Sequence, residues 1–160
     1  MVVSFSWKLN QSSLGFNEKP EVAYREINLE SKKPISLKIA KTNTNLLIEA
    51  SEIINGNWQV SKNGVSFLNS SAVPGEDGNI VIYGHNKEKI LGSLDTLKSG
   101  DDIEIITRDN VTHKYIVKKI ETVSPTQIEV INPTSSEVLT IYTCTGLFDS
   151  KRLVVKAEPV

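Results

Sequence analysis

The sequence predicts a mostly β protein, an antiparallel or mixed barrel of six to eight short strands with little helix. Residues 35–40 (ISLKIA) alternate apolar and polar side chains, as in a strand with one buried face. Residues 80–83 (IVIY) are a continuous apolar run, which is typical of a strand buried on both faces. Turn signals such as Asn55-Gly56 separate such runs at short intervals. Short strands joined by frequent turns favour a barrel over a helical fold.

The chain divides into an N-terminal arm and one compact domain. Residues 1–33 are rich in polar side chains and sustain no apolar period of 2 or 3.6, so we expect an arm that is loosely ordered or packed on the domain. Residues 1–7 (MVVSFSW) are apolar but too few for a membrane segment, which needs about 20 residues. A membrane anchor is therefore expected to be absent from this chain, and residues 34–160 are expected to form the domain.

The other elements follow from the same signals. Residues 71–79 contain Pro74, Gly75 and Gly78 and are expected to be a loop. Residues 89–97 carry apolar side chains at helical spacing and predict a short helix or turn of about two windings. Further strands are expected within residues 48–58 and at 65–68, 103–107, 113–122, 138–143 and 153–157.

The composition argues against several classes of function. Eighteen basic and nineteen acidic residues give a net charge of −1, whereas a nucleic-acid-binding protein usually carries a basic excess. A single cysteine excludes an internal disulfide and a cysteine-based zinc cluster. The two histidines, His85 and His113, are in no metal-ligand spacing. We expect no nucleic-acid partner and no metal or other cofactor.

Cys144 and His85 are candidates for chemistry. Cys144 ends a predicted buried strand, so the sheet would hold its thiol rigidly while it faces the loops. His85 also follows a buried strand, and histidine can act as an acid or a base near neutral pH. The alternative for Cys144 is a small buried apolar side chain, and the alternative for His85 is a structural histidine. His113, which opens a strand, fits the structural role better.

Arg152 lies just before the apolar run at 153–155. A guanidinium near a thiol would stabilise the thiolate and could hold a developing oxyanion. The alternative is an ordinary surface charge. A cysteine and a histidine on separate strand ends fit a thiol-protease arrangement, whose partners are distant in sequence and close in space.

Three segments together resemble the sortase family. Residues 73–86 (VPGEDGNIVIYGHN) resemble the turn and strand that end in the family's histidine, and residues 139–144 (LTIYTC) are similar to its TLxTC signature. Residues 152–155 (RLVV) resemble the segment with its essential arginine, and residues 94–101 resemble its L..L..GD element. Ile141 replaces the commoner leucine. The spacing of Trp58, Asn63-Gly64 and Pro74-Gly75 looks most like class D and class E-like members.

This resemblance implies a closed eight-stranded β-barrel with one or two short helices and a catalytic cysteine. Cys144 would attack an LPxTG-like sorting signal and form a thioacyl enzyme, His85 would transfer protons, and Arg152 would hold the peptide and the oxyanion. Thr143 and the backbone N–H of Thr145 would contact the substrate or the oxyanion. The partners would be the sorting-signal peptide of a surface protein and an amine acceptor, either a cell-wall precursor or a pilin. The enzyme would act at the extracytoplasmic face of the bacterial membrane.

Two alternatives stay open. One is a peptide-binding surface β-domain with an inert, buried Cys144, and the other is a sortase that mainly hydrolyses its peptide. Calcium activation would require acidic residues such as Glu76, Glu104 and Glu121 to gather, but a solvated surface is the simpler interpretation of their scatter.

Overall fold

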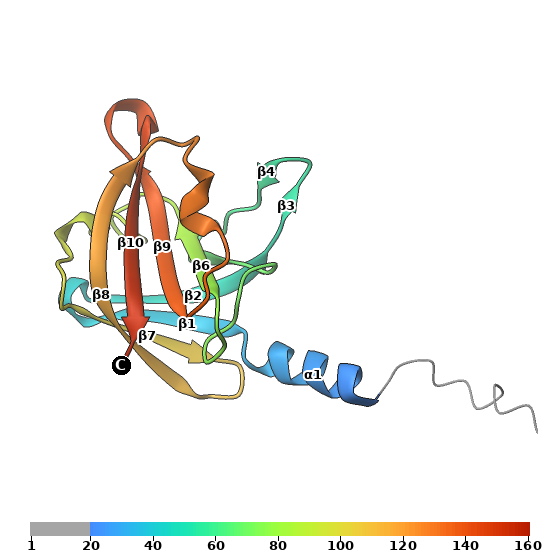
Figure 1. The fold of residues 1–160 in the computed structure, drawn as a ribbon. Helices are drawn as coiled ribbons and strands as arrows, with labels where there is room; N and C mark the ends of the chain where they lie inside the picture. The colour runs from blue at the N-terminus through green and yellow to red at the C-terminus, as the bar shows by residue number, and fades with distance from the viewer. Residues whose placement is uncertain (1–19) are drawn as a thin grey trace, which may run out of the picture.

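Eight strands close into a barrel in the computed structural model, which describes residues 20–160 (Figure 1). Around the barrel the order is β1-β2-β5-β6-β9-β10-β8-β7, and β3 and β4 form a separate two-stranded hairpin. The barrel strands are β1 (Pro34–Ile39), β2 (Thr44–Ser51), β5 (Val65–Leu68), β6 (Asn79–Gly84), β7 (Asp102–Thr107), β8 (Thr112–Val123), β9 (Val138–Thr145) and β10 (Lys151–Pro159). The hairpin strands are β3 (Ile53–Ile54) and β4 (Asn57–Trp58).

The barrel is mixed, one of the two arrangements that the sequence predicts. β2 pairs with β5 and β6 pairs with β9 in parallel, whereas the other barrel neighbours are antiparallel. Parallel strands need a crossover between them. The β3–β4 hairpin lies in the first crossover, and the long segment from β6 to β9 contains β7 and β8. The strands predicted at 35–40, 65–68, 80–83, 103–107, 113–122, 138–143 and 153–157 are all confirmed.

Alternating side chains of the strands fill the barrel. Ile80 and Ile82 of β6 meet Leu139 and Ile141 of β9 in the interior, and all four are fully buried. Burying a side chain of this size stabilises the fold by roughly 1.5–3 kcal/mol relative to leaving it exposed. Since neighbouring strand residues point to opposite faces, the residues between these four point out of the barrel. The outward face of β6 and β9 is the face that carries the site described below.

Of the two possibilities expected for residues 89–97, a short helix or a turn, the structure has turns. This segment is a series of turns, and only the 3-10 helix η2 (Leu94–Thr96) lies within it. Ile90, Leu91, Leu94 and Leu97 are nevertheless buried in the core. A Cβ on Gly92 would lie 2.7 Å from the backbone of Lys87, so the chain folds back more tightly than a helix allows. Other 3-10 helices in the described part are η1 (Ala40–Thr42), η3 (Ile128–Ile131) and η4 (Leu147–Asp149).

A helix that the sequence pattern does not predict precedes the barrel. α1 (Pro20–Ser31) projects from the end of the barrel at which β1 begins and β10 ends (Figure 1). The backbone N–H groups of Arg108 and Asp109 donate 3.0 Å hydrogen bonds to the carbonyls of Lys33 and Ser31. These bonds attach the end of this segment to the β7–β8 turn. Lys32, in the same segment, forms an ion pair with Glu76. Residues 1–19 of the expected arm lie outside the described residues.

A helix that crosses a membrane must be both long and apolar. Within residues 20–160, no helix combines the length and the apolar content that crossing a bilayer requires.

Candidate active site

His85 and Cys144 lie at the ends of neighbouring parallel strands, at the same end of the barrel: His85 follows β6, and Cys144 is the last residue but one of β9. Gly84 of β6 is in register with Thr143 of β9, and His85 and Cys144 each come one residue later. The buried Thr143 hydroxyl donates a 2.8 Å hydrogen bond to the Gly84 carbonyl, which ties the two strand ends together. The parallel ladder therefore brings together two residues that are 59 positions apart in the chain. His85 and Cys144 are both half-buried.

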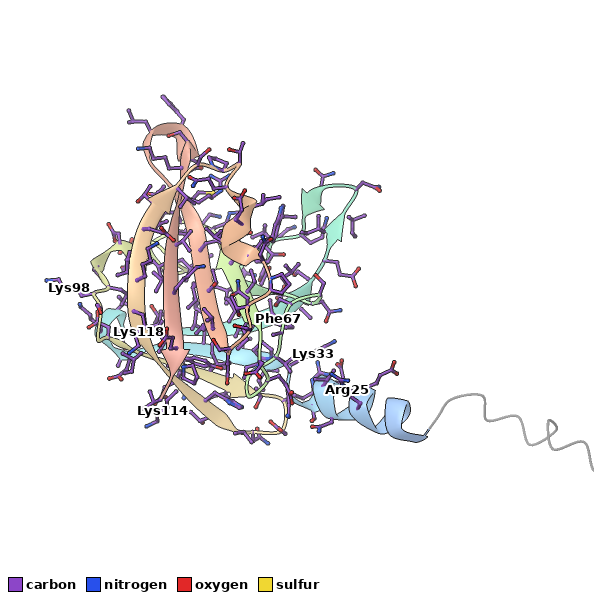
Figure 2. All side chains as sticks on the ribbon, viewed as in Figure 1. Arg25, Lys33, Phe67, Lys98, Lys114 and Lys118 are labelled. Atoms are coloured by element: carbon purple, nitrogen blue, oxygen red, sulfur yellow. The ribbon has the colours of Figure 1, made fainter. Side chains whose placement is uncertain are left out.

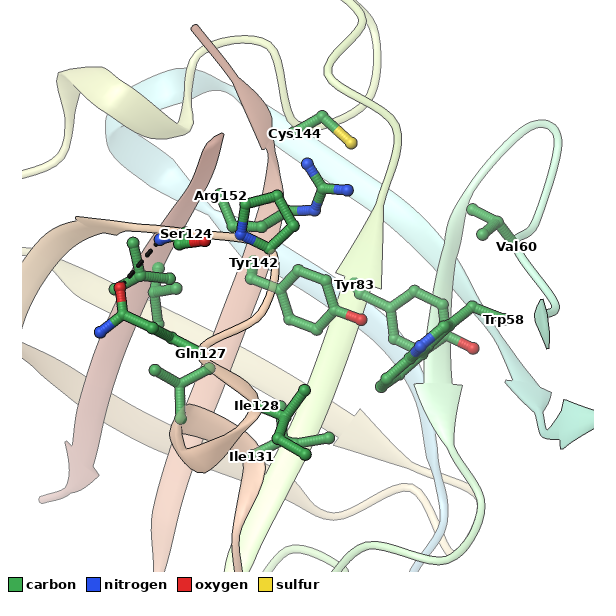
Figure 3. A pocket seen from close by; sticks show the side chains of 14 residues that line it. Trp58, Val60, Tyr83, Ser124, Gln127, Ile128, Ile131, Tyr142, Cys144 and Arg152 are labelled. Atoms are coloured by element: carbon green, nitrogen blue, oxygen red, sulfur yellow. Dashed lines mark hydrogen bonds between the residues drawn. The ribbon is translucent and has the colours of Figure 1, made fainter. Parts of the chain in front are cut away.

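Arg152 lies directly across from Cys144 on the next strand. β9 and β10 are antiparallel, and Arg152 is the register partner of Cys144. Side chains of such a pair share one face, with Cβ atoms about 4.5–5.5 Å apart. Figure 3 shows the guanidinium group and the sulfur atom together at one end of a groove. Strand order thus sets His85, Cys144 and Arg152 in a row along the rim of the barrel.

The guanidinium of Arg152 also holds the loop between β9 and β10. Its Nη1 donates to the carbonyl of Asp149 at 2.8 Å and to that of Lys151 at 2.9 Å. Phe148 and Asp149 both have left-handed backbone, with φ of 54° and 57°, which is uncommon for residues other than glycine. Within residues 20–160, Nη2 and Nε of Arg152 have no protein acceptor. Those nitrogens are available to bind a ligand oxygen.

An apolar groove begins at Cys144 and Arg152 and runs over the outer face of the barrel (Figure 3). Val60 lines one side, the rings of Trp58, Tyr83 and Tyr142 form the floor, and η3 supplies the other side. The remaining lining residues are Val123, Ser124, Pro125, Gln127, Ile128, Val130, Ile131 and Val154. A largely apolar lining with few polar groups is typical of a site for an extended, mostly apolar ligand.

Three aromatic rings build the floor of the groove. Tyr83 and Tyr142 are register partners and stack with centroids 5.5 Å apart, and the Trp58 ring meets them edge-on at 4.9 and 5.7 Å. The Tyr83 hydroxyl donates a 2.6 Å hydrogen bond to the Gln59 carbonyl, which fixes the segment after β4. Burial raises the pKa of Tyr142 far above its ordinary value; Tyr83 adds to this effect, and Arg152 opposes it. The hydroxyl of Tyr142 therefore stays neutral.

The sequence analysis missed these aromatic residues as part of the site. The available signal was strand alternation: Tyr83 lies two residues before His85, and Tyr142 lies two residues before Cys144. Residues two apart on a strand share a face. The side chain of Thr143 points away from the groove toward Gly84, and Thr145 is half-buried at the end of β9, opposite Lys151.

His113 is at the opposite end of the barrel from His85. Val123, at one end of β8, pairs with Arg152, and His113 is near the other end of that strand. A Cβ on Gly75 would lie 3.3 Å from the His113 ring, so the ring packs against this turn.

The acidic residues considered for calcium are dispersed. Glu76 pairs with Lys32, Glu104 with Lys114 and Glu121 with Lys119. In the part of the chain that the structure describes, no group of three or more His, Cys, Asp or Glu residues is placed to hold a metal ion.

A cysteine beside a histidine and an arginine is an arrangement that suits nucleophilic catalysis by a thiol, and here it lies at adjoining strand ends of a closed β-barrel. Residues 37–160 match the family model of the sortase domain. The chain belongs to the sortase family.

Known sortases are similar to this chain in sequence and in fold. Sortase A of Bacillus anthracis is 31% identical over 101 residues, which are 61% of this chain and 47% of that relative. The chain thus spans about half the length of this curated relative. The Clostridium perfringens sortase D5 transpeptidase is 26% identical, with a TM-score of 0.70 over 91% of each chain. Corynebacterium diphtheriae sortase A is 27% identical, with a TM-score of 0.68 over 90% of this chain and 70% of that one. These relatives are of different classes and do not assign this chain to one of them.

Proposed function

We propose that this chain is a cysteine transpeptidase that cleaves an LPxTG-like sorting signal and transfers the surface protein to an amine acceptor. The observation that supports this best is the register pair of Cys144 and Arg152 at the head of an apolar groove, with His85 at the adjoining strand end. The similarity to the Clostridium perfringens transpeptidase adds support. A Clostridium perfringens sortase C has been solved with a C-terminal cell wall sorting motif, and its fold is the same with a TM-score of 0.68 at 23% identity.

In the first half of the reaction, the Cys144 thiolate attacks the carbonyl carbon of the threonine in the sorting signal. The C–N bond after this threonine breaks and a thioester to Cys144 forms. His85 donates its proton to the leaving amine, which departs with the C-terminal part of the peptide. The apolar groove would hold the residues before the scissile bond.

In the second half, the acceptor amine attacks the thioester carbonyl. His85 takes the proton from this amine, a new amide bond forms, and the bond from sulfur to carbon breaks to restore Cys144. The two halves together balance: His85 regains from the acceptor amine the proton that it gave to the leaving amine, and Cys144 is again a thiolate. The acceptor would be a cell-wall precursor amine or a pilin lysine.

Arg152 would bind the peptide and the oxyanion of each tetrahedral intermediate through Nη2 and Nε, in the manner of an oxyanion hole. The backbone N–H of Thr145 is a second proposed donor. Because the hydroxyl of Thr143 is already bonded to Gly84, we assign Thr143 as a positioning residue that aligns the two strand ends. No cofactor is needed for these steps.

The proposal extends to the place of action. The protein would work at the extracytoplasmic face of the bacterial membrane, where sorting signals and cell-wall amines meet. Residues 34–160 would form the catalytic domain, and residues 1–33 would form an arm outside the catalytic machinery.

The test uses an LPxTG-containing peptide as donor and triglycine as acceptor. We expect the wild-type protein to give both a cleaved peptide and a peptide extended by triglycine. Cys144→Ala removes only a sulfur atom, so it should keep the unfolding midpoint while slowing cleavage at least about a hundredfold.

The outcomes separate the alternatives. Cleavage without any triglycine product would replace transfer by hydrolysis. No cleavage, together with a Cys144 that resists alkylation in the folded protein, would favour the peptide-binding domain.

A further inference from the structure

Two basic turns lie beyond His85 at the same end of the barrel as Cys144. One turn, at residues 61–64, carries Lys62, and the other, which follows His85, carries Lys87 and Lys89. These three lysines line one depression together with Asn63, Glu88 and Ile90. We call Lys62, Lys87 and Lys89 the basic rim. All three are exposed.

The fold fixes the position of the basic rim relative to the reacting groups. Lys62 precedes β5, Lys87 and Lys89 follow β6, Cys144 is on β9, and Arg152 is on β10. These strands are consecutive neighbours in the barrel. Along this end of the barrel the order is therefore basic rim, His85, Cys144 and Arg152. The rim lies beyond His85, and Arg152 lies on the other side of Cys144.

The second turn is attached to His85 by its backbone. The carbonyl of His85 accepts hydrogen bonds from the N–H groups of Lys87 at 2.9 Å and Leu91 at 3.3 Å. The Lys87 carbonyl in turn accepts from Gly92 at 2.8 Å. This closed turn holds the backbone of the two lysines at a fixed place beside His85.

The charge of the basic rim is not compensated within the protein. Its three lysines face one carboxylate in the depression, that of Glu88. Within residues 20–160, none of the three has a carboxylate oxygen within 4.0 Å, whereas Lys32, Lys33, Lys41, Lys114 and Lys119 each have one. A local excess of positive charge stands out on a chain whose net charge is −1. Such a patch raises the local concentration of anionic ligands and their association rate.

The two sides of the site thus suit two different molecules. The groove that runs from Cys144 over β6 and β9 is apolar and fits the donor peptide, and the turns beyond His85 are cationic and fit an anion. His85 is the group that takes the proton of the incoming amine in the proposed function. A molecule held by the basic rim would therefore present its amine beside the base.

We propose that the basic rim binds the acceptor, and that this acceptor is an amine that carries carboxylate groups within a few residues of its reactive nitrogen. The inference rests on the proposed transpeptidase function. The lysines would bind the carboxylates as hydrated ion pairs and would take no part in bond making. The basic rim affects only the binding of the acceptor, so the rate of thioester formation does not depend on these lysines.

The experiment compares two acceptor peptides that differ only in charge, Gly-Gly-Gly-Glu-Glu-amide and Gly-Gly-Gly-Gln-Gln-amide. The quantity measured is kcat/KM for the acceptor, at a fixed concentration of LPxTG-containing donor and at low and high salt. The test variant is Lys62→Gln/Lys87→Gln/Lys89→Gln. The control variant is Lys118→Gln, because Lys118 is an exposed lysine on β8, which β9 and β10 separate from β6 (Figure 2).

We expect the wild-type protein and Lys118→Gln to prefer the glutamate acceptor by about threefold or more at low salt, with the preference shrinking as salt increases. The triple variant should use both acceptors equally while it cleaves the donor at the wild-type rate. Equal use of both acceptors by the wild-type protein, or an unchanged preference in the triple variant, overturns this proposal and leaves the proposed function intact. Failure to cleave the donor at all overturns the proposed function and this inference with it.

Discussion

Arg152 has two sets of partners, which use different nitrogens of its guanidinium group. Nη1 holds the carbonyls of Asp149 and Lys151, while Nη2 and Nε face the site beside Cys144. The loop that Nη1 holds contains two residues with left-handed backbone, a conformation that costs energy unless the surroundings fix it. The same side chain thus supports the loop between β9 and β10 and offers donors to a substrate.

Replacing Arg152 by lysine separates charge from geometry. Lysine keeps the positive charge but cannot give two parallel N–H donors. Loss of one oxyanion donor typically costs about 10²–10³ in rate, or roughly 2.7–4 kcal/mol. We expect Arg152→Lys to lower kcat/KM for the donor peptide at least about a hundredfold, with Arg152→Ala lower still.

Alkylation of Cys144 in the free enzyme is the internal control for this variant. It should change far less than turnover, because a contact made in the transition state does not act on the resting thiol. If alkylation slows as much as turnover does, Arg152 acts mainly by activating the thiol. Turnover of Arg152→Lys close to that of the wild type would show that Arg152 contributes only its positive charge.

At the scale of elements, one asparagine fastens the wall of the groove to the barrel. Asn79 begins β6 and is almost fully buried. Its amide nitrogen donates to the carbonyls of Val130 and Asn132, both at 3.0 Å, and its oxygen accepts from Thr140 at 2.6 Å. Since η3 forms one side of the groove, this single side chain connects barrel stability with groove shape.

Asn79→Ala should therefore weaken both properties. Three hydrogen bonds are lost and two carbonyls lose a donor, so we expect the free energy of unfolding to fall by about 2–4 kcal/mol in urea denaturation. KM for the donor peptide should increase as η3 loosens. The matched control is Asn69→Ala, because the buried Oδ1 of Asn69 has no hydrogen-bond partner within residues 20–160. A control that loses as much stability as Asn79→Ala would contradict this account.

The strands were more predictable than the helices, for a physical reason. Residues 35–40 alternate apolar and polar side chains and residues 80–83 are a continuous apolar run, and each pattern is complete within a few residues of one strand. α1 has no such pattern, since Leu29 is its described contact with the core. In residues 89–97, buried apolar side chains on successive turns imitate helical spacing, and the tight approach of Gly92 to Lys87 becomes visible only in three dimensions.

The candidate site was predictable in part. The residues that carry reactive groups could be named from their positions at strand ends, but their partners depend on strand order. The contact of β6 with β9 crosses more than fifty residues, and the groove floor of Tyr83, Tyr142 and Trp58 exists only once these strands and the β3–β4 hairpin are assembled. No spacing rule in the sequence reports such long-range pairing.

At the scale of the whole molecule, a second set of polar contacts closes the barrel at the end opposite Cys144. One oxygen of Glu137 accepts from the backbone N–H of Gly75 at 2.9 Å and from the hydroxyl of Tyr115 at 2.7 Å. Burial raises the pKa of Tyr115 far above its ordinary value, and the bond to Glu137 adds to this effect. Tyr115 is fully buried, so its neutral hydroxyl needs this acceptor.

Substitutions at Glu137 should change stability without changing catalysis. Glu137→Gln keeps a carbonyl oxygen for both donors and should cost less than about 1.5 kcal/mol. Glu137→Ala leaves the Tyr115 hydroxyl unpaired and should lower the free energy of unfolding by about 2–3 kcal/mol. Both variants should retain wild-type kcat/KM for the donor at temperatures at which they are folded. A large loss of activity in Glu137→Gln would show that the two ends of the barrel are coupled.

The position of α1 has a practical consequence for attaching this protein to a surface. α1 enters the barrel at the end where β10 also finishes, and the Val160 N–H bonds to the Lys114 carbonyl there at 3.1 Å. Cys144 lies at the other end, across the whole length of β10. A bead or an electrode coupled through either end of the described chain would thus leave the reactive thiol pointing into solution. The barrel then lies between the surface and Cys144, whichever end of the described chain is attached.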